Sequence, residues 1–267
     1  MKIGFFDSGI GGLITLSGVV KKLPDYDFVY LGDTARVPYG NRSEETIAQF
    51  TQEGIKYLLK EEDCRLVIIA CNTASSDALR NIQQKFLPKK YSDRKVLGVI
   101  IPTVEEVVQR SFKRIGLIGT IATINSHTYE EELDKLGYTG KVFTQKTPLL
   151  VPLVENNELE YSVSILRDYL SILIKENIEA LILGCTHYAL FKKNIRDMLG
   201  DNVVVFSQDE IIGEKLKNYL ENHTEINLNL DRNGEIKFLL TDLTESSREI
   251  GSQWFGRSID FELVKYY

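Results

Sequence analysis

Two cysteines at matching places in the chain are the residues best suited to acid–base chemistry. Each follows a short apolar run and precedes polar residues, in Ala70-Cys71-Asn72-Thr73 and Gly184-Cys185-Thr186-His187. A free thiol has a pKa of about 8.5, and a helix that starts beside it favours the thiolate. A single buried cysteine is usually just a small apolar side chain. Two at matched positions instead predict proton transfer by thiols, with Asp7 and His187 able to supply or hold protons.

These matched positions belong to an internal repeat. The segment Lys2–Ser8 resembles Arg114–Thr120 at an offset of 112 residues (114 − 2). The segment Leu66–Thr73 resembles Ala180–His187, with the two cysteines 114 residues apart (185 − 71). Two matches at nearly one offset predict two similar α/β halves. If the halves face each other, the two thiols approach one cleft from opposite sides, and such interfaces favour small-molecule sites.

Short apolar runs alternate with amphipathic stretches, which predicts strands alternating with helices around largely parallel sheets. Seven runs are rich in β-branched residues, as strands covered on both faces are. They are Lys2–Phe6, Phe28–Leu31, Leu66–Ala70, Val96–Ile100, Ile115–Ile118, Ala180–Gly184 and Val203–Phe206. Ligands bind beyond the carboxyl ends of parallel strands. Asp7, Cys71, Thr120 and Cys185 should therefore all lie at such ends.

Three helices are expected from amphipathic spacing and capping patterns. Ser43 to Glu61 places its apolar residues on one face. Thr103 and Glu106 form a capping-box pattern for a helix that runs toward Phe112. Ser126 should cap another helix that ends near Gly137.

The first expected strand leads into a glycine-rich turn, Asp7-Ser8-Gly9-Ile10-Gly11-Gly12. Glycines let the backbone approach a ligand closely, and amides at a helix start can hold a carboxylate or phosphate. A dinucleotide fingerprint would need glycine where this chain has Ile14, although Asp33 sits near the place of a ribose-binding acid. Phosphoryl transfer through Asp7 and a plain aspartate-capped turn are the other interpretations of this segment alone.

Composition and charge exclude several classes of protein. Of the 267 residues, 43% are hydrophobic and 26% charged, which is ordinary for a globular chain and not for a disordered one. The net charge of −6 argues against a nucleic-acid partner. No apolar run reaches the ~18 residues of a membrane helix, and no secretory signal is visible. Three cysteines without a CxxC pair and three scattered histidines favour reduced thiols in the cytoplasm and no metal site.

Five motifs together resemble the cofactor-independent aspartate/glutamate racemase family over nearly the whole chain. They are Phe6-Asp7-Ser8-Gly9-Ile10-Gly11-Gly12, Asp33-Thr34 with Pro38-Tyr39-Gly40, Ala70-Cys71-Asn72-Thr73-Ala74, Gly119-Thr120-Ile121-Ala122-Thr123 and Gly184-Cys185-Thr186-His187-Tyr188. The opening motif looks like the glutamate branch. The resemblance implies two similar α/β lobes related by pseudo-twofold symmetry, with the active site between them. It implies that residues 1–98 and 208–267 form the first lobe and residues 99–207 the second. One departure is Ala189, where the family often has proline, and it puts the local backbone shape in doubt.

The resemblance also implies a reaction and a set of site residues. It implies interconversion of L- and D-glutamate without cofactor or metal. In that reaction Cys71 would deprotonate the D-isomer and Cys185 the L-isomer. Asp7 assists the first thiol and His187 the second, and Glu155 matches a family carboxylate that either takes part in catalysis or only supports His187. The implied substrate site is lined by Asp7, Ser8, Pro38, Tyr39, Gly40, Asn72, Thr73, Thr120, Thr123, Thr186 and His187.

By the same resemblance, the chain is expected to be a cytoplasmic bacterial enzyme and a homodimer, with no membrane partner. Its product, D-glutamate, would supply peptidoglycan and so cell-wall biogenesis and cell shape. The chain starts without the extension that accompanies activation by a cell-wall precursor in the family, so that regulation is not expected. The alternatives are an aspartate racemase, a related isomerase or decarboxylase, and a two-lobed amino-acid binding protein without chemistry.

Overall fold

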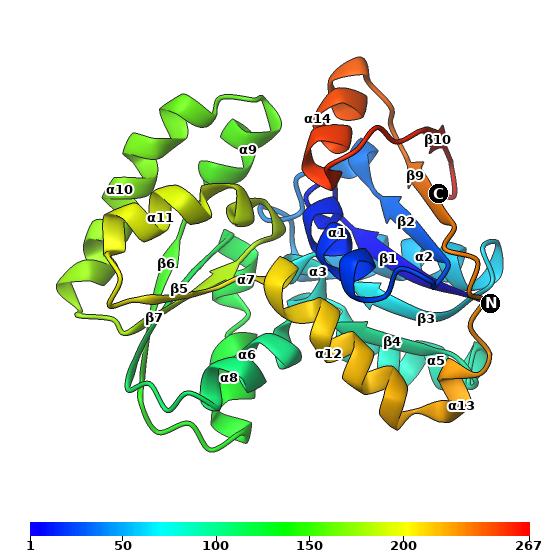
Figure 1. The fold of residues 1–267 in the computed structure, drawn as a ribbon, viewed down its shortest axis with the longest axis horizontal. Coiled ribbons are helices and arrows are strands. Elements are labelled where there is room, and N and C mark those ends of the chain that lie inside the picture. The colour runs from blue at the N-terminus through cyan, green and yellow to red at the C-terminus, as the bar shows by residue number, and fades with distance from the viewer.

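The computed structural model describes residues 1–267, which fold into two α/β lobes side by side (Figure 1). The first lobe holds a six-stranded sheet in the order β10-β9-β2-β1-β3-β4, and the second a four-stranded sheet in the order β6-β5-β7-β8. Every paired strand is parallel. Helices flank both sheets, so the expected fold class is confirmed.

All seven expected strands form, and three more strands were not expected. The strands are β1 (Lys2–Asp7), β2 (Phe28–Gly32), β3 (Cys64–Ile69), β4 (Lys95–Gly98), β5 (Arg114–Gly119), β6 (Lys141–Lys146), β7 (Ala180–Gly184), β8 (Val204–Phe206), β9 (Ile236–Leu240) and β10 (Phe261–Leu263). The unexpected ones are β6, β9 and β10. Two of these are edge strands, and β6 is polar and half exposed, so it lacks the apolar run that marks a buried strand.

The order of strands repeats between the two sheets. The run β2-β1-β3-β4 in the first lobe has the same order as β6-β5-β7-β8 in the second, while β9 and β10 extend the first sheet only. Thus β1 corresponds to β5 and β3 to β7, as the sequence repeat predicts. The lobe boundaries at residues 98/99 and 207/208 stay a prediction, and we propose them because sheet membership changes at those points.

The helices from α6 to α11 accompany the second sheet, and the others accompany the first. They are α1 (Gly12–Lys22), α2 (Glu44–Lys60), α3 (Asn72–Asp77), α4 (Leu79–Asn81), α5 (Leu87–Lys90), α6 (Ile100–Val108), α7 (Ile121–Asn125), α8 (Thr128–Lys135), α9 (Leu150–Glu155), α10 (Leu159–Lys175), α11 (Lys192–Leu199), α12 (Gln208–Asn222), α13 (Thr224–Asn227) and α14 (Glu245–Phe255). Short turns of other helix types are η1 (Thr34–Arg36), η2 (Ile82–Phe86) and η3 (Thr186–Phe191). Ser43 caps α2 through a hydrogen bond from the Thr46 amide at 3.3 Å, which agrees with the expected helix.

One expected helix start is wrong, and a second is displaced by one residue, although the Ser126 hydroxyl still accepts from the Thr128 amide at 3.3 Å. Helix α6 begins at Ile100, so Thr103 lies inside it and donates its hydroxyl to the Val99 carbonyl at 2.7 Å instead of capping. The expected strand end at Ile100 is also wrong, because β4 stops at Gly98. Ser126 follows the last residue of α7, and α8 starts only after His127, whose φ is 55°. The His127 side chain is exposed and its Nδ1 lies 3.3 Å from Oε1 of Glu130.

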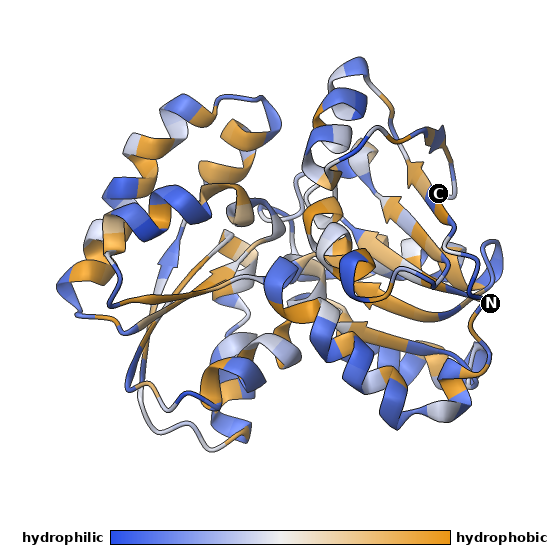
Figure 2. Cartoon of the chain, viewed as in Figure 1, coloured by the Kyte–Doolittle hydropathy of each residue, from blue (hydrophilic) through white to orange (hydrophobic).

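Most strands are predominantly hydrophobic, as the orange arrows in Figure 2 show. One buried cluster continues from the first sheet into the second, so the lobes are joined by packed side chains as well as by the chain. Two further clusters lie in one lobe each. Cys64 belongs to the first lobe's cluster, where burial raises its pKa, consistent with a structural thiol. No helix is both long and apolar enough to cross a membrane.

Candidate active site

A pocket lies between the lobes, at the carboxyl ends of both sheets. Its lining comprises Ser8, Val37, Pro38, Tyr39, Gly40, Asn41, Cys71, Asn72, Thr73, Thr120, Thr147, Pro148, Val151, Pro152, Cys185, Thr186 and His187. Cys71 faces it from the first lobe and Cys185 from the second. The enclosed space is about 30 Å³, far below the volume of a usual ligand site. The lobes or the loops at the rim must therefore move apart to admit a substrate.

Cys71 is the residue before α3, and its sulfur makes two hydrogen bonds. Its Sγ donates to the Ser8 hydroxyl at 3.4 Å and accepts from the Ala74 amide at 3.4 Å. Burial, followed by the charge of Asp7, raises the pKa of Cys71 to about 12 against these two hydrogen bonds. The expectation that the helix start would favour the thiolate is wrong here, because burial outweighs it.

Cys185 is paired with a histidine. Its Sγ lies 3.6 Å from Nδ1 of His187, whose Nε2 lies 3.3 Å from Oε1 of Glu155. Burial opposes the charge of the imidazole, but Cys185 and Glu155 outweigh burial and raise the pKa of His187 well above its usual value. Glu155 ends α9 and contacts His187 from outside the pocket lining. The imidazole ring thus sits between the Cys185 sulfur and the Glu155 carboxylate, both of which favour its charged form.

Asp7, the last residue of β1, is fully buried behind the lining. Its Oδ2 accepts from the Gly9 amide at 3.2 Å, while Oδ1 has no partner. Burial raises the pKa of Asp7, although the charge of His187 and nearby backbone amides oppose the rise. A buried carboxyl of this kind can accept or return a proton close to Cys71.

Three threonine hydroxyls meet where the lobes touch. Thr73 Oγ1 lies 2.9 Å from Thr120 Oγ1 and 3.1 Å from Thr123 Oγ1. Thr120 and Thr123 are 3.0 Å apart, and Thr120 also caps α7 by accepting from the Thr123 amide. Thr73 and Thr120 line the pocket, with Thr123 behind them. Hydroxyls that are hydrogen-bonded to one another in this way can rotate and donate to a carboxylate.

Asp33 fixes the loop after β2 through hydrogen bonds to its side chains. The Asp33 carboxylate accepts from the Tyr39 hydroxyl, from Arg36 Nε at 2.7 Å and from the Thr241 hydroxyl at 3.0 Å. These bonds hold Pro38 and Tyr39 at the pocket. They also leave Asp33 engaged within the protein, which argues against the ribose-binding interpretation.

Two glycines let the lobes approach closely. A Cβ on Gly11 would lie 2.5 Å from the Thr186 hydroxyl and 2.8 Å from the His187 ring. A Cβ on Gly40 would lie 2.7 Å from Cβ of Thr120. Any larger residue at either position would push the lobes apart. The glycine-rich turn therefore serves contact between the lobes, and a dinucleotide is not needed to explain it.

Two polar atoms around the pocket are buried without a hydrogen-bond partner. They are Asp7 Oδ1 and Asn72 Nδ2, on residues that are at most 2% exposed. An unpartnered buried polar atom costs roughly 1–3 kcal/mol. A ligand with both acidic and basic groups would satisfy Asn72 as a donor and Asp7 as an acceptor. No group of three or more His, Cys, Asp or Glu side chains is arranged to hold a metal ion.

The predicted site residues divide into those that line the pocket and those behind it. Both cysteines line it, together with Ser8, Pro38, Tyr39, Gly40, Asn72, Thr73, Thr120, Thr186 and His187. Asp7, Thr123 and Glu155 stand behind this lining. The sequence analysis missed the segment from Thr147 to Pro152, which follows β6 as the predicted loop at Pro38 follows β2. Extending the repeat to β6 would have found it.

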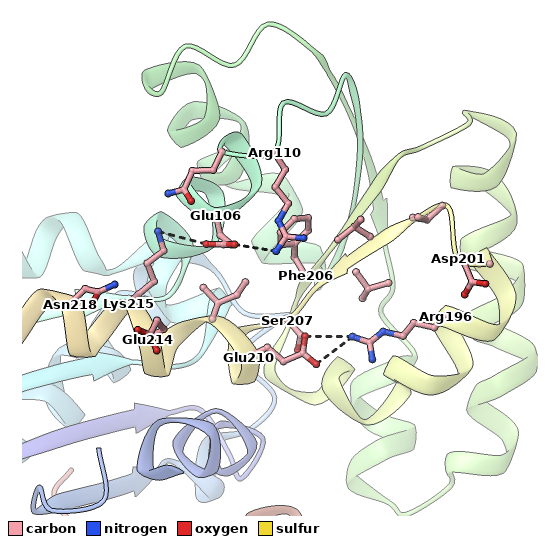
Figure 3. A pocket seen from close by; sticks show the side chains of 16 residues that line it. Glu106, Arg110, Arg196, Asp201, Phe206, Ser207, Glu210, Glu214, Lys215 and Asn218 are labelled. Atoms are coloured by element: carbon pink, nitrogen blue, oxygen red, sulfur yellow. Dashed lines mark hydrogen bonds and ion pairs between the residues drawn. The ribbon is translucent and has the colours of Figure 1, made fainter. Parts of the chain in front are cut away.

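A larger hollow of about 650 Å³ lies along β8, α6, α11 and α12 (Figure 3), and neither Cys71 nor Cys185 lines it. Its charged side chains pair with one another across the lobes. Arg196 on α11 lies 3.3 Å from Glu210 on α12, and Lys215 on α12 lies 4.0 Å from Glu106 on α6. These ion pairs tie α12 to the second lobe near the crossing of the chain.

Comparisons with known proteins agree with this site. The family model for Asp/Glu/Hydantoin racemase matches residues 17–208. The chain is 42% identical to the glutamate racemase of Sulfurihydrogenibium sp., over 96% of this chain and 94% of the relative. It is similar to the solved structure of a glutamate racemase isoform from Bacillus anthracis, with a TM-score of 0.89 and 34% identity over 99% of this chain and 97% of that one. A glutamate racemase from Francisella tularensis, solved in complex with D-glutamate, has a TM-score of 0.88 and 31% identity over 99% and 97% of the two chains. The resemblance expected from the motifs is confirmed.

Proposed function

Since the chain belongs to the Asp/Glu/hydantoin racemase family, we propose that it interconverts L- and D-glutamate by a two-thiol mechanism that uses no cofactor. One observation carries the proposal: Cys71 and Cys185 follow equivalent strands of the two sheets and line one pocket. Inverting the α-carbon requires a proton to leave one face and another to arrive on the opposite face. Thiols supplied by opposite lobes meet that requirement, whereas a binding protein has no need of them.

In the L-to-D direction, the Cys185 thiolate removes the α-proton, and the Cys71 thiol gives its own proton to the other face. The enzyme then holds a Cys185 thiol and a Cys71 thiolate, which is the form that acts on D-glutamate. The raised pKa of Cys71 suits a proton donor. The imidazolium of His187, 3.6 Å from Cys185, faces the sulfur that carries negative charge.

Regeneration of the starting form requires Cys185 to release its proton to solvent when the site opens and a proton to return to Cys71. Asp7 is proposed for this step, because its charge acts on Cys71 and burial raises its own pKa. Oδ1 of Asp7 is also free to accept from the substrate ammonium. We assign the substrate carboxylates to Asn72 Nδ2, Ser8 and the hydroxyls of Thr73, Thr120 and Thr186, with Thr123 supporting two of these threonines. Closure over the small cavity would exclude water and strengthen these contacts.

We further propose that the D-glutamate serves peptidoglycan synthesis in a bacterial cytoplasm, and so cell-wall biogenesis and cell shape. This step is supported by the bacterial glutamate racemases to which the chain is similar. A homodimer is proposed only from the family resemblance of the sequence motifs.

The proposal is tested by proton NMR of L-glutamate with the purified protein in D2O, without added cofactor, alongside circular dichroism. Loss of the α-proton signal with decay of the dichroic signal to zero supports racemisation. Aspartate is examined in parallel. If only aspartate loses its α-proton signal, aspartate replaces glutamate as the proposed substrate. Glutamate binding with an unchanged α-proton would favour the binding-protein alternative. If the protein neither binds glutamate nor exchanges its α-proton, the proposal is overturned.

A further inference from the structure

We propose that Tyr129 is a positioning residue, which acts from the second lobe to orient the side-chain amide of Asn72 toward the substrate carboxylate. The inference rests on the proposed function, because it assigns Asn72 a carboxylate to bind. Tyr129 lies on α8 and does not line the pocket, so it acts only through its neighbour.

A short chain of hydrogen bonds carries the inference. The Tyr129 hydroxyl donates to Oδ1 of Asn72 at 2.6 Å and accepts from Nε2 of Gln208 at 3.3 Å, and the same Gln208 nitrogen makes a longer bond of 3.5 Å to Oδ1 of Asn72. Gln208 begins α12, where the chain returns to the first lobe. All three side chains are buried, and Tyr129 is fully so. A phenol has one hydrogen to give, and here Asn72 receives it.

The consequence for Asn72 follows from the two ends of its amide. With Oδ1 held by Tyr129, Nδ2 is turned the other way, and it is buried without a partner. Asn72 lines the pocket directly after Cys71. An amide N–H in that position can donate to a carboxylate, whereas a flipped amide would present its oxygen and repel one. The tyrosine hydroxyl selects the binding orientation.

The same bond crosses between the lobes. Asn72 begins α3 in the first lobe, whereas Tyr129 belongs to the second. Separation of the lobes would break this bond and leave Oδ1 of Asn72 with only the longer 3.5 Å contact to Gln208 in its own lobe. The amide is therefore held most firmly when the lobes are together, which links recognition of the carboxylate to closure of the site.

The test is a double-mutant cycle of Tyr129→Phe and Asn72→Ala, read as the Kd for glutamate by calorimetry and as the KM for both enantiomers. Tyr129→Phe should weaken binding about fivefold or more, equally for L- and D-glutamate, because the carboxylates are common to both. In the Asn72→Ala background the same change should have no further effect. Tyr138→Phe is the matched control, since its hydroxyl donates only to the Lys141 carbonyl at 3.3 Å.

Three results would overturn the inference. They are an unchanged Kd in Tyr129→Phe, independent effects of the two substitutions, and weakened binding accompanied by loss of the folded state in circular dichroism. Wild-type protein measured in the same series separates the two proposals. If it fails to racemise glutamate, the function is wrong; if it racemises and the cycle shows no coupling, only the role of Tyr129 is wrong.

Discussion

The sulfur of Cys185 lies 3.6 Å from Nδ1 of His187, two residues further along the chain. Cys71, at the equivalent place in the first lobe, has the Ser8 hydroxyl at 3.4 Å instead. The two halves thus repeat their backbone but not the chemistry around the thiol. One sulfur faces a cation that is supported by Glu155, and the other is a buried neutral thiol beside Asp7. This asymmetry allows one thiol to begin as acceptor and the other as donor.

Replacing either pocket cysteine should abolish racemisation in both directions. Cys71→Ser and Cys185→Ser each remove one of the two proton carriers, and we expect a loss of about 10³-fold in turnover. Decay of the circular dichroism signal of each pure enantiomer checks this, because a variant with one thiol can exchange the α-proton without inverting the carbon. Cys64→Ala is the matched control, because Cys64 is buried in the first lobe's core and away from the pocket. Full racemisation by a variant that lacks one pocket thiol would contradict the mechanism.

The positions of the thiols could be predicted because their strands are buried on both faces and therefore read as continuous apolar runs. Strand β6 gives no such signal, since it lies at a sheet edge with half-exposed residues. The pocket segment that follows β6 was missed for that reason. Tyr129 was missed for another: its role depends on a contact with Asn72 from a different lobe, which no local pattern encodes.

Asp77 should destabilise the folded protein near neutral pH. Burial raises its pKa from 3.8 to about 6. Its contribution to stability is fully present below pH 3.8 and is lost as pH rises through about 6. Asp77→Asn should therefore raise the free energy of unfolding by about 1 kcal/mol at pH 7.5, after allowance for partial exposure of the side chain, and by less at pH 4.5.

Urea unfolding at the two pH values measures this effect, with Asp25→Asn in an exposed turn as the control. A gain that is the same at both pH values would mean that the ionisation of Asp77 is not its cause.

Gly40 should be needed for closure more than for folding. A Cβ there would lie 2.7 Å from Cβ of Thr120 in the other lobe, so Gly40→Ala should hold the loop away from the pocket. We expect kcat/KM to fall about tenfold or more, since small displacements of a site are costly to catalysis. The unfolding temperature should change little, because the contact lies between the lobes. Steady-state kinetics and thermal unfolding check both statements, and an unaltered kcat/KM would show that the contact is not required.

Glu155 should act through His187 and not on the substrate. It lies 3.3 Å from Nε2 of His187 and does not line the pocket. Burial lowers the pKa of His187, while Cys185 and Glu155 raise it above the usual value, so Glu155→Gln should bring that pKa down. If activity needs the imidazolium, kcat/KM should fall as pH rises in both forms, and the fall should begin at a lower pH in the variant than in the wild type.

The pH dependence of kcat/KM distinguishes this role from direct catalysis. At acidic pH both forms should be similar, since His187 is charged in each, and the difference should grow to about tenfold at basic pH. A direct proton acceptor would instead give a large loss that is the same at every pH. Glu160→Gln, an exposed change at the start of α10, is the matched control and should leave the profile in place.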